Sequence, residues 1–218
     1  FYFSILSIAI FFILAKTFTM RNSLLFFLFS MSVFGQTDYP KDYFRSPLDV
    51  PLFLSGTFGE LRGNHFHSGL DFKTQQKEGL NVYASADGYV SRIKISTWGY
   101  GKAIYVTHPN GFTTVYGHLS KASPVIEAYI KKNQYAQKAF EVEMNPKEGE
   151  LVFKKGDIIA FSGNSGGSGG PHLHFEVRDS KTEKTINPML FGFDKMVSDT
   201  KSPIINNLVV YPIGDSSS

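Results

Sequence analysis

Residues 172–178 of this 218-residue chain alternate between apolar and polar side chains, and this pattern constrains the fold more than any other. Apolar residues occupy every second position from Leu173, and histidines stand at His172 and His174. Because side chains of a strand repeat with a period of two, both imidazoles leave one face while the apolar residues turn to the core. Two interpretations are open: solvated histidines on a polar edge strand, or a metal ligand beside a proton-transfer group.

Two further segments contain polar residues of the same kinds. His67 and Asp71 stand four positions apart in one segment, and His118 ends a strand-like run in the other. Five of the chain's six histidines lie in these three short segments, each beside glycine, which is not expected of scattered surface histidines. Catalytic zinc usually has three protein ligands and one open position for water. His67, Asp71 and His174 would supply two nitrogens and one carboxylate oxygen.

The three segments resemble, in order, the motifs of the M23 family of zinc metallopeptidases, the lysostaphin-like endopeptidases. They are His67-Ser68-Gly69-Leu70-Asp71 (HxxxD), Tyr116-Gly117-His118-Leu119 (of the YxHL type) and His172-Leu173-His174 (HxH). The glycine-rich approach at 162–171 and the run Phe58-Gly59-Glu60-Leu61-Arg62 also resemble that family. The resemblance covers roughly residues 50 to 193, and no polar residue of the three motifs is missing.

This resemblance implies a mainly β fold, with an antiparallel β-sheet groove and a small helical insertion. It implies a zinc metalloendopeptidase that hydrolyses peptide bonds in the stems or cross-links of bacterial peptidoglycan. His67, Asp71 and His174 would bind one zinc ion, and His118 and His172 would be the catalytic pair. One of the pair would take the proton from zinc-bound water and both would hydrogen-bond the oxyanion, although the sequence does not divide these roles.

Two other functions have some support in the fold or the sequence. Some relatives of this fold have lost metal ligands and act as non-enzymatic regulators that activate other cell-wall hydrolases, but no ligand is missing here. Residues 83–90 suggest a biotinyl- or lipoyl-like carrier domain, but that stretch contains no lysine to present. A net charge of +3 is too small to indicate nucleic-acid binding, and the absence of cysteine excludes a thiol nucleophile. The oligomeric state is left open.

The first 35 residues are expected to lie outside the fold. Residues 1–19 precede Met20 and are interpreted as an upstream, non-native segment. Residues 20–35 have the basic start, short apolar core and small residues of a signal peptide. The alternative is a longer anchor, which Lys16 and Arg21 between the two apolar runs oppose. After cleavage the protein would be exported to the periplasm, cell envelope or extracellular space without a stable membrane anchor.

Glycine and aromatic residues are frequent and helical patterns are few, which indicates an all-β domain. Its predicted organisation is a lead-in at 36–51, a peptidase domain at 52–193, and a linker with the start of a truncated further domain at 194–218. Strands are predicted at 103–107 and 112–116, joined by an Asn-Gly turn.

Four finer expectations concern single positions. Asp87-Gly88 predicts a second hairpin within residues 80–95. His108 is expected to be a surface residue at a turn, and His65 to line the groove or support a ligand. Gly69 is expected to let the backbone pass close to the metal.

Residues 120–150 interrupt the strand pattern. Ser123-Pro124 predicts the start of a helix that ends near Lys131-Lys132, with strands after it at 139–143 and 151–153. This insertion would either wall the groove or serve only packing, and both remain open. The glycine-serine run at 162–170 is followed by a strand and not by a helix, which argues against a phosphate-binding loop.

Overall fold

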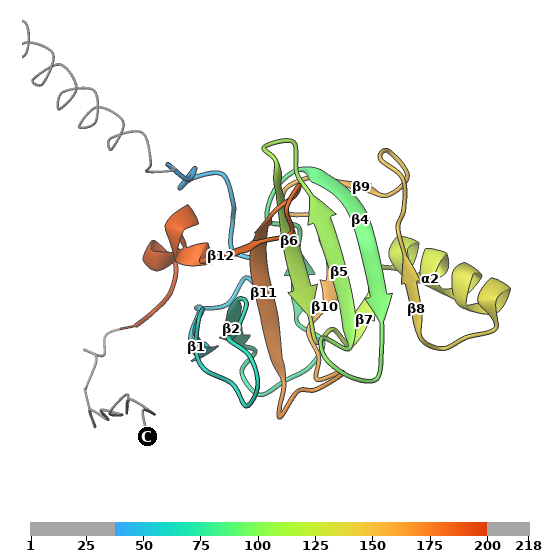
Figure 1. Cartoon of the computed structure of the whole chain (residues 1–218), viewed down its shortest axis with the longest axis horizontal. Coiled ribbons are helices and arrows are strands. Elements are labelled where there is room, and N and C mark those ends of the chain that lie inside the picture. The colour runs from blue at the N-terminus through green and yellow to red at the C-terminus, as the bar shows by residue number, and fades with distance from the viewer. Residues whose placement is uncertain (1–37, 200–218) are drawn as a thin grey trace, which may run out of the picture. The chain divides into compact units, whose positions relative to one another are not determined.

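The structure is a computed structural model that describes residues 38–199, and its main element is a nine-stranded antiparallel sheet (Figure 1). The strands follow the order β1 (Leu54–Gly56), β2 (Leu70–Lys73), β11 (His172–Asp179), β6 (Phe112–Gly117), β5 (Lys102–Thr107), β4 (Gly88–Ile95) and β8 (Val142–Met144). Strand β12 (Thr185–Ile186) pairs with β11, and β9 (Val152–Phe153) pairs with β4. The predicted class, mainly antiparallel β with a small helical insertion, is confirmed.

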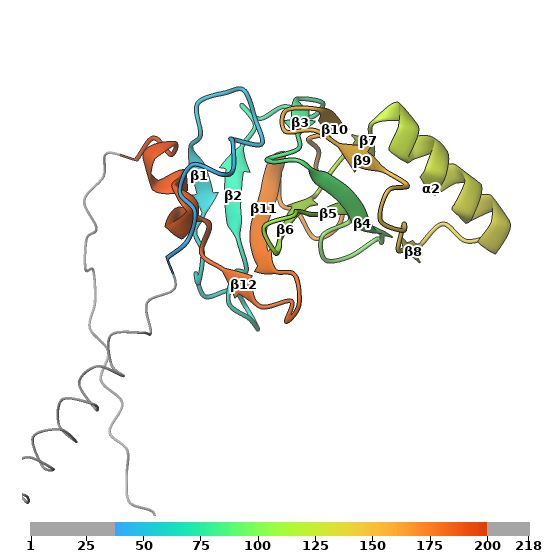
Figure 2. The ribbon, with the colours of Figure 1, turned by 90° about the horizontal axis from the view of Figure 1, so that it is seen from above.

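A smaller sheet and three helices complete the described part. The smaller sheet has the order β3 (Asn81–Tyr83), β10 (Ile158–Phe161) and β7 (Lys121–Ala122). Helix α2 (Pro124–Gln137) lies beside β8 at one end of the large sheet, and two 3₁₀ turns, η1 (Pro188–Phe191) and η2 (Phe193–Lys195), lie towards the other end (Figures 1 and 2). Within residues 38–199 no helix has the length and apolar character required to cross a bilayer.

Aromatic packing on the core face holds together the two strands that carry most of the motif residues. Phe72 of β2 and Phe175 of β11 have ring centroids 5.9 Å apart, and Phe193 lies 5.0 Å from Phe175. All three rings are fully buried. Burial of a phenylalanine side chain stabilises a fold by roughly 1.5–3 kcal/mol, so this cluster fixes β2 against β11 from behind.

The start of helix α2 is confirmed, but its predicted end is wrong. Ser123 is the N-cap residue and Pro124 lies in the first turn. The helix continues to Gln137 and ends where Lys138 adopts a left-handed conformation with φ of 51°. The lysines near 131 are good helix formers and do not stop the helix, whereas a left-handed residue ends the hydrogen-bonding pattern.

The strands around 82 and 90 are correct, but they do not form a hairpin. Strand β3 pairs with β10 in the small sheet and β4 pairs with β5 in the large one. Asp87 instead accepts hydrogen bonds from the backbone of Lys155 and from the side chain of Lys154. The hairpin of β5 and β6 across the Asn-Gly turn is confirmed by the pairing of Thr107 with Thr113.

His108 is buried, so its predicted place on the surface is wrong. Its ring is only 3% exposed, and its nitrogens contact the carbonyl oxygen of Asp87 and the hydroxyl of Thr114, both at 2.8 Å. Burial lowers the pKa of His108 to about 4, so it is neutral at pH 7. The sequence pattern places the turn correctly but does not show that the turn folds inward.

Residues of the predicted lead-in pack on the domain. Phe44 and Leu48 are buried, and the ring of Phe44 lies 5.5 Å from that of Phe191. The expectations for residues 1–35, namely the upstream segment and the signal peptide, lie outside the described residues, as do residues 200–218 of the predicted linker and further domain at 194–218.

Candidate metal centre

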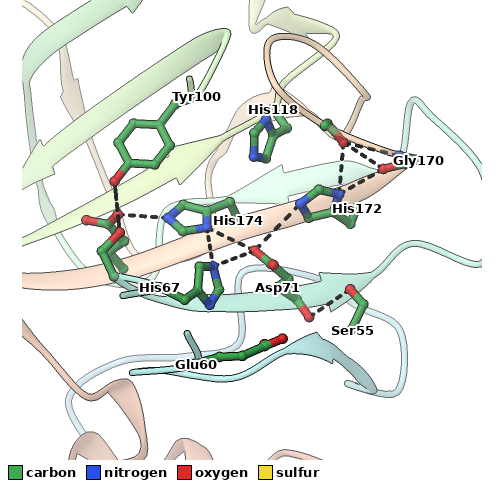
Figure 3. Close-up of polar contacts among 12 residues, drawn as sticks. Ser55, Glu60, His67, Asp71, Tyr100, His118, Gly170, His172 and His174 are labelled. Carbon is green, nitrogen blue, oxygen red and sulfur yellow. Dashed lines mark hydrogen bonds and ion pairs between the residues drawn. The ribbon is translucent and has the colours of Figure 1, made fainter. Parts of the chain in front are cut away.

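The strand register brings the predicted site residues to one face of the large sheet (Figure 3). Asp71 on β2 is the direct partner of His174 on β11, and His174 is paired on its other side with Gly117 at the end of β6. His118 follows Gly117, and His67 stands in the loop that precedes β2. His172 and His174 leave the same face of β11, as the alternation predicted.

Gly69 allows β2 and β11 to approach closely. A Cβ atom at this position would lie 2.2 Å from the carbonyl oxygen of Phe175 and 2.8 Å from the side chain of Glu176. The crowding that requires a glycine here comes from the neighbouring strand, and the predicted close approach of the backbone to the metal stays a prediction.

His67, Asp71 and His174 form a compact group in which three ligand atoms face one another. His67 Nε2 lies 3.0 Å from both Asp71 Oδ1 and His174 Nδ1, and His174 Nδ1 lies 2.9 Å from Asp71 Oδ1. All three residues are buried. Two imidazole nitrogens and one carboxylate oxygen at this spacing fit a metal site.

Hydrogen bonds at the outward-facing nitrogens of His67 and His174 fix which nitrogen of each ring faces the cluster. His67 Nδ1 lies 2.8 Å from the carbonyl oxygen of Thr57, and His174 Nε2 lies 2.8 Å from the carboxylate of Glu176. Both partners accept hydrogen bonds, so each outward nitrogen carries the proton. The inward nitrogens, His67 Nε2 and His174 Nδ1, face each other and Asp71 Oδ1, and in this arrangement they could hold a metal ion.

The pKa shifts of Asp71 and His174 show how the charges of the cluster depend on one another. Burial alone would raise the pKa of Asp71, but its close contacts with the imidazoles of His172, His174 and His67 outweigh burial and hold that pKa far below the usual range. Burial lowers the pKa of His174, but hydrogen bonds to Asp71 and Glu176 outweigh it and raise that pKa. A proton and a metal ion would therefore compete for His174 Nδ1.

His118 and His172 lie beside this group, with ring centroids 4.6 Å apart. Their Nδ1 atoms donate to the carbonyl oxygens of Ser165 and Gly170 respectively, both at 2.8 Å, so each Nε2 is left as an acceptor. His172 Nε2 lies 3.6 Å from Asp71 Oδ1. Burial lowers the pKa of His118 to about 4, so its ring is neutral at pH 7 and able to accept a proton.

Two loops hold His118 in place through a close contact between glycines. Gly101 and Gly166 have positive φ angles of 63° and 72°, and a Cβ atom on either would lie about 2.5 Å or less from the backbone of the other. This contact places the carbonyl of Ser165 against His118. The glycine-serine run thus has an ordered structural role.

Glu176 and Tyr100 belong to the site, although the sequence analysis did not select them. Glu176 is fully buried, and its Oε1 contacts His174 at 2.8 Å and the hydroxyls of Ser68 and Tyr100 at 2.5 Å. Arg178 binds the other oxygen at 2.6 Å, and the ring of Tyr100 stacks on His174 at 4.8 Å. The available signal was the alternation itself, which puts position 176 on the face of the two histidines.

We expect Glu176→Gln to weaken zinc binding by about 10–100-fold, because the carboxylate holds the His174 proton on Nε2 and an amide can present a donor there instead. Competition against a chromophoric chelator would give the dissociation constant. Tyr100→Phe is the matched control, since it removes one hydrogen bond to the same oxygen and keeps the contact with His174. An unchanged dissociation constant in Glu176→Gln would show that Glu176 has no part in orienting the ligand.

Two cavities meet at the cluster and together form a groove across it. The narrower, of about 260 Å³, is lined by the four site histidines and Tyr100, and also by His65. The wider, of about 620 Å³, extends from Asp71 and His172 towards Lys73. His65 is exposed and lines the groove, as predicted. Neither cavity is lined by residues 120–150, so the insertion packs against the sheet and does not wall these cavities.

The fold is that of the lysostaphin-like peptidases. The structure matches the antimicrobial peptidase lysostaphin from Staphylococcus simulans with a TM-score of 0.50 and 25% identity, over 72% of this chain and 56% of that protein.

The sequence comparisons agree. Residues 65–138 match the sequence model of peptidase family M23. A Haemophilus influenzae protein named as an uncharacterized metalloprotease is 32% identical over 155 residues, which cover 68% of this chain and 27% of that protein. The DD-carboxypeptidase/endopeptidase Mpg of Neisseria meningitidis serogroup B is 37% identical over 123 residues, which cover 56% of this chain and 22% of that protein. The chain belongs to peptidase family M23. It spans about a quarter of the length of these relatives.

Proposed function

We propose that this chain is a zinc-dependent metalloendopeptidase that hydrolyses peptide bonds in bacterial peptidoglycan. The observation that carries the proposal is the set of four histidines around Asp71, each with one ring nitrogen bonded outward to an acceptor and the other facing the groove. Membership of family M23 and the activity for which the Neisseria relative is named support the same reaction and substrate class.

His67, Asp71 and His174 would hold one zinc ion through Nε2, Oδ1 and Nδ1. When bound, the ion would polarise the scissile carbonyl and lower the pKa of a bound water molecule towards ~7. Arg62 supports this arrangement, because its guanidinium donates to Asp71 Oδ2 at 2.9 Å and leaves Oδ1 for the cluster.

His118 and His172 would perform the proton transfers. Because each Nδ1 donates to a backbone carbonyl, each Nε2 is oriented to accept a proton from the attacking water. Once protonated, the same nitrogen becomes a donor that stabilises the developing oxyanion. The two cavities on either side of the cluster would hold an extended peptide across these groups.

The alternative function is a non-enzymatic regulator that binds and activates other cell-wall hydrolases. Relatives of that kind lack part of the HxxxD or HxH set, whereas His67, Asp71, His172 and His174 are all present here. We further propose that the protein acts outside the cytoplasmic membrane, where its substrate lies. We propose neither a nucleic-acid partner nor a stable membrane anchor for it.

The proposal predicts that the zinc-loaded protein releases new amino groups from purified peptidoglycan. A chelator should abolish this release, and added zinc should restore it, because the ligands remain in place after the metal is removed. Labelling of free amines before and after digestion would measure the reaction. A protein that holds zinc and yet cleaves neither peptidoglycan nor short stem-peptide mimics would favour the regulator instead.

A further inference from the structure

We infer that the wider cavity beside the metal cluster binds a carboxylate group of the substrate peptide through the ammonium group of Lys73. The inference rests on the proposed peptidase function and deepens it. It names the side of the groove, the chemical group and the residue that selects it.

Lys73 lies next to the proposed catalytic groups. Asp71 and Lys73 are two positions apart on β2, so their side chains leave the same face of the strand. Across the sheet, Lys73 is the direct partner of His172 on β11. A strand rises about 3.3 Å per residue, so Lys73 is within reach of a group one or two residues from the scissile bond of an extended peptide.

Among the charged residues of this cavity, Lys73 is the one whose charge is not already used. The cavity wall contains Arg62, Asp71 and Lys73. Arg62 binds Asp71 Oδ2 at 2.9 Å and Glu60 at 3.3 Å, and Asp71 faces the metal cluster with its other oxygen. The side chain of Lys73 is exposed and has no ion-pair or hydrogen-bond partner within residues 38–199. Its ammonium therefore forms no ion pair in this wall, and Lys73 lines a neighbouring cavity together with Glu60 and Asp199.

The remainder of the wider cavity is neutral, so nothing there opposes an anion. Gln75, Gln76 and Ser55 offer polar groups, and Phe53 and Pro171 offer apolar surface. The anion that a stem peptide contains is a carboxylate, either at its C-terminus or on a side chain. An ammonium that is free in the wall would bind that group with modest strength, because it is partly exposed to solvent.

The narrower cavity is lined by imidazoles and Tyr100 and contains no free ammonium. Arg62 reaches this side also, but its guanidinium is bonded to Asp71 and Glu60. The two sides of the groove therefore differ in charge. This asymmetry favours one orientation of the peptide, with its carboxylate-bearing part on the Lys73 side of the metal.

The test compares two matched pairs of stem-peptide mimics on the zinc-loaded full chain. One pair differs only in a C-terminal carboxylate or carboxamide, and the other only in a side-chain carboxylate or carboxamide near the scissile bond. In at least one pair the acid is expected to have a KM roughly 3–10-fold lower than the amide, with kcat little changed. Lys73→Met should raise KM for that acid alone, and Lys73→Arg should keep the preference.

Lys77→Met is the control for general loss of positive charge, because Lys77 is an exposed lysine of the following turn that does not line the cavity. It should leave both pairs unchanged. No acid preference in either pair would overturn the inference. An acid preference that survives Lys73→Met would also overturn it, since the carboxylate would then bind the zinc ion or Arg62.

Equilibrium binding of the same four peptides, measured by calorimetry, separates this inference from the proposed function. Binding that favours the acid through Lys73 without cleavage would contradict the peptidase proposal and support the carboxylate site. Cleavage with no acid preference in KM or in binding would support the peptidase and refute the site.

Discussion

Replacing His67 or His174 by alanine is expected to reduce bound zinc from about one ion per chain to almost none. The two nitrogens and Asp71 Oδ1 lie within 3.0 Å of one another, so each residue supplies one third of the protein ligands. A site left with one imidazole and one carboxylate binds zinc poorly. Metal content after gel filtration in a weak chelator would measure this loss.

His65→Ala is the matched control for that experiment. His65 stands two residues before His67 and lines the same cavity, but its Nδ1 contacts Asn64 at 2.7 Å and its side chain is exposed. The control should keep one zinc ion. Zinc should also raise the melting temperature of the wild type and of His65→Ala but not of the two ligand variants, because a bound ligand stabilises only a fold that holds it. Undiminished zinc in both ligand variants would contradict the assignment.

His118→Ala and His172→Ala are expected to keep zinc and lose most peptidase activity. Neither residue belongs to the group of three converging ligand atoms, and each presents an acceptor nitrogen to the groove. General acid–base groups typically contribute about 10²–10⁴-fold to a rate, so the loss should be far larger than the scatter of an assay. Amine release from peptidoglycan, with zinc content measured on the same samples, would test both halves of the expectation.

The conformation of His118 calls for a second variant. Its φ angle is 57°, in the left-handed region, which asparagine tolerates better than alanine. His118→Asn should therefore fold and bind zinc like the wild type while lacking a basic nitrogen. Loss of activity in both His118 variants would separate chemistry from backbone strain. Near-normal turnover in a variant of either histidine would leave the assignment as an enzyme intact but would contradict the proposed role of that residue.

The local patterns predicted the parts of the fold that depend on neighbours in sequence. The two-residue period of β11 predicted that Leu173 and Phe175 are buried while His172 and His174 share the opposite face. The Asn-Gly turn predicted the hairpin of β5 and β6. These features follow from backbone geometry alone, which is why a sequence suffices to find them.

The predictions from sequence were wrong where contacts between distant segments decide the structure. His108 stands at a turn, as predicted, but Asp87 and Thr114 meet it in the interior. Asp87-Gly88 has the chemistry of a hairpin turn, yet the strands on its two sides enter different sheets. Pairing across a sheet depends on partners far away in the chain, and no local signal records them.

For the site, the sequence by itself determined which kinds of ligand and proton acceptor are available, and the three motifs named the five residues that the structure brings together. Only the tertiary structure decided how each ring is oriented. The carbonyls of Thr57, Ser165 and Gly170 and the carboxylate of Glu176 hold the outward protons. Those acceptors come mostly from backbone groups, which every residue type has. The physical reason is that a backbone carbonyl has no sequence signature, so its contact with a histidine appears only when the chain is folded.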